Sequence, residues 1–211
     1  MKSVIAIATV LVATLFAGAA SAQMSTPGDR IGDASQPGFG GADSMADAPV
    51  AKQRNDPEGI AEDLRLAGHC DRAMPILQRL ANNRTGYELS QFNLGLCLFD
   101  LAKKEKDPAQ AASMNKEGAG WILMAADGGL GKAQQEAVVL YLDGLGVSAD
   151  PVEAGKWAYL YHDNGSRLVL HQPDLSPDLR GRLDAVLVGP KRREARQRAD
   201  NWTQTGQTMD N

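Results

Sequence analysis

The amino-acid sequence predicts an all-α protein, an α-α superhelix (solenoid) in which antiparallel helix pairs follow one another along the chain. Three observations support this class. Apolar residues recur every three or four positions from residue 57 onward, which is the spacing of one helix face. Glycine and asparagine residues interrupt these runs at intervals of about one helix length. A segment that contains a tryptophan occurs twice, and serial repetition of helix pairs is typical of solenoids.

Six helices follow from the apolar spacing, each closed by a helix stop. Their apolar faces are, in order, Ile60, Leu64 and Ala67; Ala73, Ile76, Leu77, Leu80 and Ala81; Leu89, Phe92, Leu96 and Phe99; Ala119, Ile122, Leu123 and Ala126; Ala133, Ala137, Leu140 and Tyr141; and Ala154, Trp157, Ala158 and Tyr161. The stops between and after them are Gly68-His69, Asn82-Asn83, the polar turn Lys103–Asp107, Asp127-Gly128-Gly129, the glycines 144 and 146, and Asn164-Gly165.

Two of these units align with each other. The segment Gly120–Gly129 matches Lys156–Gly165, so Trp121 and Trp157 occupy equivalent positions. Upstream, Ser90–Gly95 matches Ala133–Val138 at a longer spacing. The longer spacing predicts extra residues in the connection Ala102–Lys116 of the earlier unit.

Gly144, Gly146 and Ala149 have the spacing of a dinucleotide-binding fingerprint, Gly-x-Gly-x-x-Ala. That fingerprint requires a strand before it and a helix N-terminus after it. Here a helical run precedes Gly144. The segment Asp150–Glu153 supplies an N-cap, a proline at the first helical position and a carboxylate at the third. We therefore interpret the stretch as a turn between two helices, with glycines that adopt positive φ.

At this point the sequence resembles the Sel-1-like repeat, a relative of the tetratricopeptide repeat. The matching unit reads Ala133-x7-Tyr141-x2-Gly144-x-Gly146-Val147-x2-Asp150-x3-Ala154-x2-Trp157 and is followed by a glycine stop. The usual Leu-Gly pair of the first helix is Ala137-Val138 here, but it stands as Leu94-Gly95 in the preceding unit. That preceding unit contains Trp121 and lacks the Gly-x-Gly-Val turn. A more divergent unit spans Ile60–Ala81, so the resemblance covers about Gly59–Gly165.

The resemblance implies a right-handed stack of helix pairs with a concave surface, used for protein–protein interaction or scaffolding. First helices line the concave side in this family, and they carry the polar residues Gln91, Asn93, Gln134, Gln135 and Glu136. These five residues are our candidate protein-binding surface, although the same residue types also suit ordinary solvated positions. Some cysteine-rich exported members of the family bind cell-wall-related or antibiotic ligands. A small-ligand-binding protein or cell-wall-active enzyme is therefore the alternative function.

The N-terminal residues predict export. Lys2 precedes an uninterrupted apolar run, Val4–Phe16, and Ala20-Ser21-Ala22 ends it with small residues at the positions that a signal peptidase reads. Residues 1–22 are predicted as a signal peptide. The alternative is an uncleaved anchor, but the run is short for a bilayer span of about 20 residues. We expect a periplasmic or secreted protein without stable membrane insertion after cleavage.

The remaining segments differ in composition. Residues 23–56 are rich in glycine and proline and have no apolar periodicity, so they are predicted as a disordered linker before the repeats of residues 57–165. Residues 166–203 are predicted as C-terminal capping helices, and residues 204–211 as a disordered tail. With 26 acidic and 22 basic residues, the chain is mildly acidic, which argues against a nucleic-acid binder.

Cys70 and Cys97 are the only thiols. An even number of cysteines in an exported protein favours a disulfide. In two antiparallel helices, residues equidistant from the turn face each other, and the midpoint of positions 70 and 97 falls inside the predicted turn 82–86. We therefore predict a Cys70–Cys97 disulfide, with two free core thiols as the alternative. Pro75 leaves open whether the second helix begins near Cys70 or later, which would place Cys70 in the turn.

The C-terminal region contains two further predicted helices. The first starts at Ser176-Pro177-Asp178, and Gly189-Pro190 separates it from a basic helix, Lys191–Arg198. Their apolar positions are Leu179, Leu183, Val186 and Leu187, and then Ala195, Ala199 and Trp202. Terminal helices with a polar outer face cap solenoids, and Glu194 and Arg198 have the spacing of a helical ion pair. The alternative for the basic helix is contact with an anionic membrane through Arg192, Arg193 and Arg196.

The sequence nominates no catalytic residue. His69, His162 and His171 are not spaced as metal ligands, and no Gly-x-Ser-x-Gly nucleophile motif is present. We expect a non-enzymatic protein without cofactor or metal that binds a protein partner.

Overall fold

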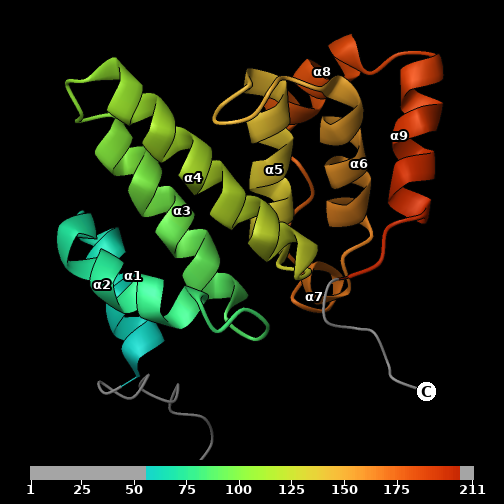
Figure 1. The fold of residues 1–211 in the computed structure, drawn as a ribbon. Coiled ribbons are helices and arrows are strands. Elements are labelled where there is room, and N and C mark those ends of the chain that lie inside the picture. Colours follow the sequence, from blue (N-terminus) through green and yellow to red (C-terminus); the bar gives the residue numbers. More distant parts are fainter. Residues whose placement is uncertain (1–55, 205–211) are drawn as a thin grey trace, which may run out of the picture. The chain divides into compact units, whose positions relative to one another are not determined.

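The computed structural model describes residues 56–204 (Figure 1). The predicted signal peptide, the linker up to residue 55 and the tail from residue 205 lie outside these residues. Between residues 56 and 204 the chain forms nine helices and no strand, which confirms the all-α class. The helices are α1 (Pro57–Leu66), α2 (Cys70–Ala81), α3 (Glu88–Ala102), α4 (Pro108–Asp127), α5 (Gly131–Asp143), α6 (Pro151–His162), α7 (Gly165–Val169), α8 (Pro177–Val186) and α9 (Pro190–Asp200).

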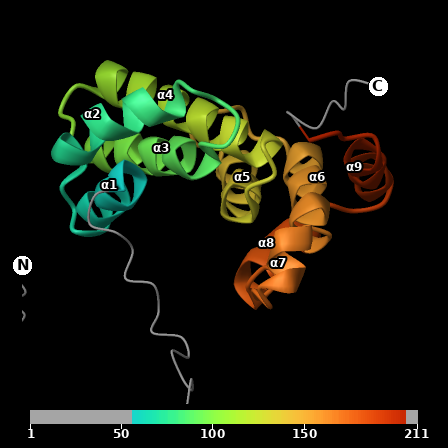
Figure 2. The same ribbon diagram turned by 90° about the horizontal axis from the view of Figure 1, so that it is seen from below.

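Successive helices pack against each other along the chain. Helix α1 contacts α2 and α3, and the contacts then continue from α2 to α3, α3 to α4, α4 to α5 and α5 to α6. In both views α6 lies between α5 and α9 (Figures 1 and 2), and α6 also contacts α8. The basic helix α9 thus packs against α6.

Most helix starts use the capping chemistry that the sequence indicates. Asp56, Asp107 and Asp150 each precede a proline and accept hydrogen bonds from backbone N–H groups of the first turn. Asp150 Oδ1 accepts from Val152 N at 2.8 Å. These side chains satisfy N–H groups that have no partner inside the helix, and proline at the first position needs none.

The predicted polar turn Lys103–Asp107 is the connection between α3 and α4. The extra residues were expected in the connection Ala102–Lys116, which is wrong beyond Asp107. Asp107 Oδ1 accepts from Ala109 N at 2.9 Å, and α4 begins at Pro108. The extra residues therefore extend α4 at its N-terminus as exposed helical turns.

Two clusters of buried apolar residues form the core. The first joins α1, α2 and α3 around the cysteines and consists of Ala61, Cys70, Ala73, Leu77, Ala81, Leu94, Cys97 and Leu98. The second runs from α3 to α9 and includes Phe92, Ile122, Leu140, Trp157 and Leu183. Burial of these side chains is the main stabilising contribution to the fold.

Helices α3 and α4 cross at a pair of glycines. A Cβ atom on Gly95 would lie 2.6 Å from the carbonyl oxygen of Gly118, and one on Gly118 would lie 2.9 Å from that of Gly95. Only glycine permits such close backbone approach. The Leu94-Gly95 pair therefore has a packing role, with Leu94 fully buried beside it.

Candidate functional site

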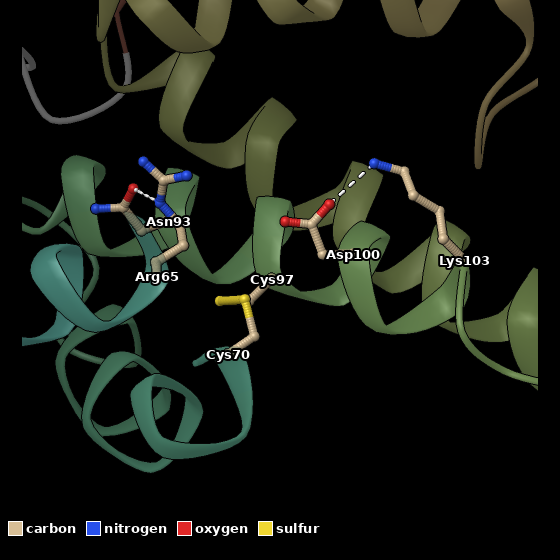
Figure 3. Close-up of a disulfide and its surroundings, with 6 residues drawn as sticks. All are labelled: Arg65, Cys70, Asn93, Cys97, Asp100 and Lys103. Carbon is tan, nitrogen blue, oxygen red and sulfur yellow. Dashed lines mark hydrogen bonds and ion pairs between the residues drawn. A yellow bond between two sulfur atoms is a disulfide. The ribbon is translucent and has the colours of Figure 1, made fainter. Parts of the chain in front are cut away.

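The disulfide prediction is confirmed. Cys70 and Cys97 form a disulfide between α2 and α3, with their Cα atoms 5.2 Å apart (Figure 3). Helix α2 begins at Cys70 and accommodates Pro75 inside it. Cys70 and Cys97 therefore face each other at equal distances from the turn, as predicted, and α2 does not begin later than Cys70.

The predicted binding surface is wrong for three of its five residues, because Gln91, Asn93 and Gln134 are buried. Gln91 Nε2 donates to the carbonyl oxygens of Ala81, at 3.4 Å, and Arg84, at 3.0 Å. Ala81 ends α2 and Arg84 lies in the turn after it, and each of these carbonyls also accepts one backbone N–H. The buried amide of Gln91 adds a second hydrogen bond to each, so a polar side chain from the next helix packs inward on this turn.

Gln134 repeats this arrangement at the end of α4. Its Nε2 donates to the carbonyl of Ala126 at 3.4 Å, and its Oε1 accepts from Asn164 Nδ2 at 2.9 Å. At the end of α6, the buried Arg167 takes the corresponding role and donates to the carbonyls of Tyr161 and His162. Three second helices therefore end against a side chain from the following helix, a feature that sequence reasoning missed.

Asn93 belongs to a polar contact between α1 and α3. Its Oδ1 accepts from Arg65 Nε at 2.7 Å (Figure 3). One turn earlier, the hydroxyl of the buried Ser90 donates to Glu58 Oε1 at 2.6 Å. These bonds hold α1 in register on α3, and Asn93 Nδ2 is buried without a hydrogen-bond partner within the described residues.

Gln135 and Glu136 remain half-exposed on α5. Burial raises the pKa of Glu136 above its ordinary value, Asp143 adds to the increase, and Lys103 opposes it. Gln135 and Glu136 are thus partly accessible, whereas the other three candidates are buried. The five residues therefore do not form a common binding surface.

Gly144, Gly146 and Asp150 build the turn between α5 and α6. Gly144 and Gly146 adopt φ of 68° and 72°, the left-handed region that favours glycine. A Cβ on Gly146 would lie 2.1 Å from the carbonyl oxygen of Asn115, so the turn rests directly on α4. The backbone N–H of Asp150 donates to the carbonyl of Tyr141 and closes the turn.

The two aligned tryptophans have different surroundings. Trp157 is buried beside Ala154, and its ring meets that of Trp202 edge to face at a centroid distance of 6.5 Å. Trp121 is half-buried against the α1–α3 cluster. Both tryptophans therefore contribute to packing.

A groove of about 950 Å³ lies between α4 and the α5–α6 turn. We call it the α4 groove. It is lined by Ala112, Asn115 and Lys116 of α4, Tyr141 of α5, and residues 144–150 of the turn. The volume is at the upper end of the range for ligand sites. The early start of α4 forms one wall, so the groove depends on the helical turns that the sequence did not predict.

The turn presents free backbone groups to this groove. Within the described residues, the N–H groups of Gly146, Val147, Ser148 and Ala149 donate to no backbone carbonyl. Because backbone N–H groups are obligatory donors, these four are available to an acceptor from outside the described backbone.

Side chains add two polar features to the groove. Burial, with the charges of Glu153, Asp127 and Asp150, raises the pKa of the Tyr141 hydroxyl, which therefore stays protonated at neutral pH and can donate. Lys116 is exposed at the edge of the groove and forms no ion pair within the described residues.

Other functional features are few in this part of the chain. Residues 56–204 contain no cluster of three or more side chains suited to hold a metal ion. None of their helices is long and apolar enough to span a bilayer. No family model matches the chain, and no curated protein matches it.

Proposed function

We propose that this protein is an exported Sel-1-like solenoid that binds an extended peptide segment of a partner protein in the α4 groove. The observation that carries the proposal is the row of four backbone N–H groups at residues 146–149, which line the groove and have no backbone acceptor. Extended peptides are recognised mainly through such main-chain hydrogen bonds, with side-chain contacts that add specificity.

The repeat interpretation supports a solenoid. The consecutive packing of α1 to α6, the left-handed glycines of the α5–α6 turn and the repeated glutamine contacts at the ends of α2 and α4 all follow from serial helix pairs. The Cys70–Cys97 disulfide supports export, because disulfides persist in oxidising compartments.

Charge gives the proposed peptide a preference. Lys116 has no ion-pair partner among the described residues, whereas Asp150 is engaged as the N-cap of α6. We expect bound peptides to place an acidic side chain or a terminal carboxylate next to Lys116. The remaining contacts, from the turn backbone and Tyr141, tolerate many sequences.

Selection of short random peptides on the mature protein, followed by titration calorimetry of the enriched peptides, tests the proposal. Ala112→Trp places a large ring in the groove, and Ala185→Trp places the same ring on the exposed surface of α8 as a control. We expect Ala112→Trp to weaken binding at least about tenfold, roughly 1.4 kcal/mol, and Ala185→Trp to leave it unchanged.

Lys116→Glu provides an independent arm of the same experiment. This substitution should weaken the binding of peptides that carry an acidic residue, and it should have little effect on the binding of neutral peptides. The proposal would be contradicted if no peptide were enriched, or if the two tryptophan variants lost the same amount of peptide affinity.

A further inference from the structure

A second cavity, of about 340 Å³, lies between α6, α8 and α9. Each helix contributes one face to it. The lining residues on α6 and on α8 follow the same pattern of three- and four-residue steps, and α9 adds two residues one turn apart. We call this space the three-helix cavity, and it is separate from the α4 groove.

The cavity has an apolar floor and a basic rim. Leu183, Leu187 and Ala158 are buried and form the floor, where Gly155 adds no side chain. The rim carries Arg180, Arg192, Arg196 and His162, together with the ring of Tyr159. A site of this kind combines apolar burial with a few directed polar groups, the usual composition of small-molecule sites.

Fixed partners orient Arg192 and Arg196. Arg192 donates from Nε to the carbonyl of Leu187 at 3.1 Å and from Nη2 to Asp184 at 2.9 Å. Arg196 pairs through Nε with Asp200 and through Nη1 with Asp163. The Arg196 guanidinium also lies over the Tyr159 ring, 5.3 Å from its centroid.

Arg180 and His162 share one carboxylate. Asp174 Oδ2 lies 2.9 Å from Arg180 Nη2 and 2.7 Å from His162 Nδ1. Burial alone would raise the pKa of Asp174, but the hydrogen bonds from His162 and the Leu175 N–H, with the charge of Arg180, bring it below its ordinary value. Asp174 is therefore ionised at neutral pH and holds both side chains at the rim.

Each guanidinium keeps donors for another ligand. A guanidinium has five N–H groups. Within the described residues, Nη1 of Arg180, Nη1 of Arg192 and Nη2 of Arg196 enter none of the contacts given above. Of the carboxylates that orient these arginines, only Asp184 lines the cavity, so three cationic groups and one anionic group face it.

We infer that the three-helix cavity binds a small molecule with one oxyanion, a carboxylate or a phosphate, attached to an apolar body. The oxyanion is recognised by the guanidinium groups of the rim, because planar guanidinium pairs match carboxylate and phosphate geometry. The apolar body occupies the floor over Leu183 and Leu187. The limited volume and the nearby carboxylates favour a single small anion over a polyanion such as nucleic acid.

NMR titration of the isotope-labelled mature protein tests the inference with three probes: octanoate, phenyl phosphate and the uncharged octanamide. We expect saturable shifts of the side-chain Nε–H signals of Arg180, Arg192 and Arg196 with at least one anion, and none with octanamide. The tighter of the two anions identifies the oxyanion as carboxylate or phosphate. Absence of a saturable shift with both anions, or equal binding of octanamide, would overturn the inference.

Matched arginine variants locate the site. Arg192→Gln and Arg196→Gln should each weaken anion binding by about tenfold, the range for a lost charge-assisted hydrogen bond. Arg193→Gln makes the same change in net charge on α9 at a residue that does not line the cavity, and it should change the affinity less than twofold. An equal effect of Arg193→Gln would show general charge attraction and refute the site.

A substitution in the apolar floor of the cavity tests the site without changing any arginine. Ala158→Met fills the cavity and leaves the charged residues of the rim unchanged, so it should also weaken the binding of octanoate by about tenfold. Thermal unfolding of each variant establishes that the helices remain folded at the titration temperature. A folded Ala158→Met protein with unchanged affinity would contradict binding in the cavity.

Discussion

Removal of the Cys70–Cys97 disulfide should produce the largest change in stability of any single perturbation considered. The bond joins residues separated by 27 positions in sequence. For a loop of this length the chain-entropy relation gives a stabilisation of about 3.5 kcal/mol at 25 °C. Both sulfur atoms lie in the α1–α3 cluster, where Cys70 is 3% exposed and Cys97 is fully buried. Reduction removes the cross-link but keeps both side chains, so it tests mainly the effect of the cross-link on the unfolded chain.

Urea unfolding of the oxidised and reduced protein, followed by circular dichroism at 222 nm, measures the difference. With a slope of about 2 kcal/mol per molar urea, the loss corresponds to a midpoint about 1.7 M lower after reduction. A Cys70→Ala/Cys97→Ala double variant should unfold near the reduced protein and should not respond to the reductant. A midpoint shift below about 0.5 M on reduction would refute the assignment of a stabilising role to the cross-link.

Three further perturbations test individual contacts, each by urea unfolding against the wild-type protein. Gly146→Ala should cost at least about 1–2 kcal/mol for the left-handed backbone, plus the clash with α4, and unchanged stability would show that the turn does not rest there. Gln134→Leu should cost about 1–3 kcal/mol because it removes two hydrogen bonds at the buried end of α4, whereas Gln135→Leu should change stability by less than about 0.5 kcal/mol; equal effects would contradict the role given to Gln134. Because its pKa is raised above 4.5 in the folded state, Glu136 binds its proton more tightly there than in the unfolded chain, and stability is lost as pH rises through the folded pKa. Glu136→Gln should therefore be more stable than wild type at neutral pH and equal to it well below pH 4.5, and a destabilised variant at neutral pH would be inconsistent with this sign.

Local signals allowed most of the helices and the disulfide to be predicted from sequence. Asp150 before Pro151 indicated a helix start through short-range hydrogen bonds, which depend on few neighbours, whereas the same Asp-Pro signal at residue 107 was not used and the short helix α7 was not predicted. The pairing of Cys70 with Cys97 followed from one turn between two antiparallel helices. Each of these predictions depends only on residues in two neighbouring helices and the turn between them.

The candidate binding residues were not predictable in the same way, because apolar periodicity assigns polar residues to solvent. Gln91 and Gln134 are buried where their amides bond to carbonyls at the ends of α2 and α4, contacts that depend on the neighbouring helix. A signal was present in the repeat alignment, since glutamine occupies the equivalent position in both units. Arg167 gave no such signal, because it follows the last aligned unit.

The two cavities depend on tertiary packing and therefore lay beyond sequence reasoning. One wall of the α4 groove comes from Ala112, Asn115 and Lys116, which fall in the segment expected to connect two helices. The basic helix was interpreted as an outer face, but Arg192 and Arg196 lie one turn apart and line the cavity with α6 and α8. Only the packing of α6, α8 and α9 shows that Arg192 and Arg196 line the cavity and that Arg193 does not.

Hydrogen–deuterium exchange of the mature protein, with and without a peptide selected on it, tests the proposed function most directly. The amides of residues 146–149 exchange freely in the empty groove because they have no backbone acceptor. Peptide binding in the α4 groove predicts slower exchange at these four positions and no change in α1 or α2. Unchanged exchange at residues 146–149 at saturating peptide would contradict the account.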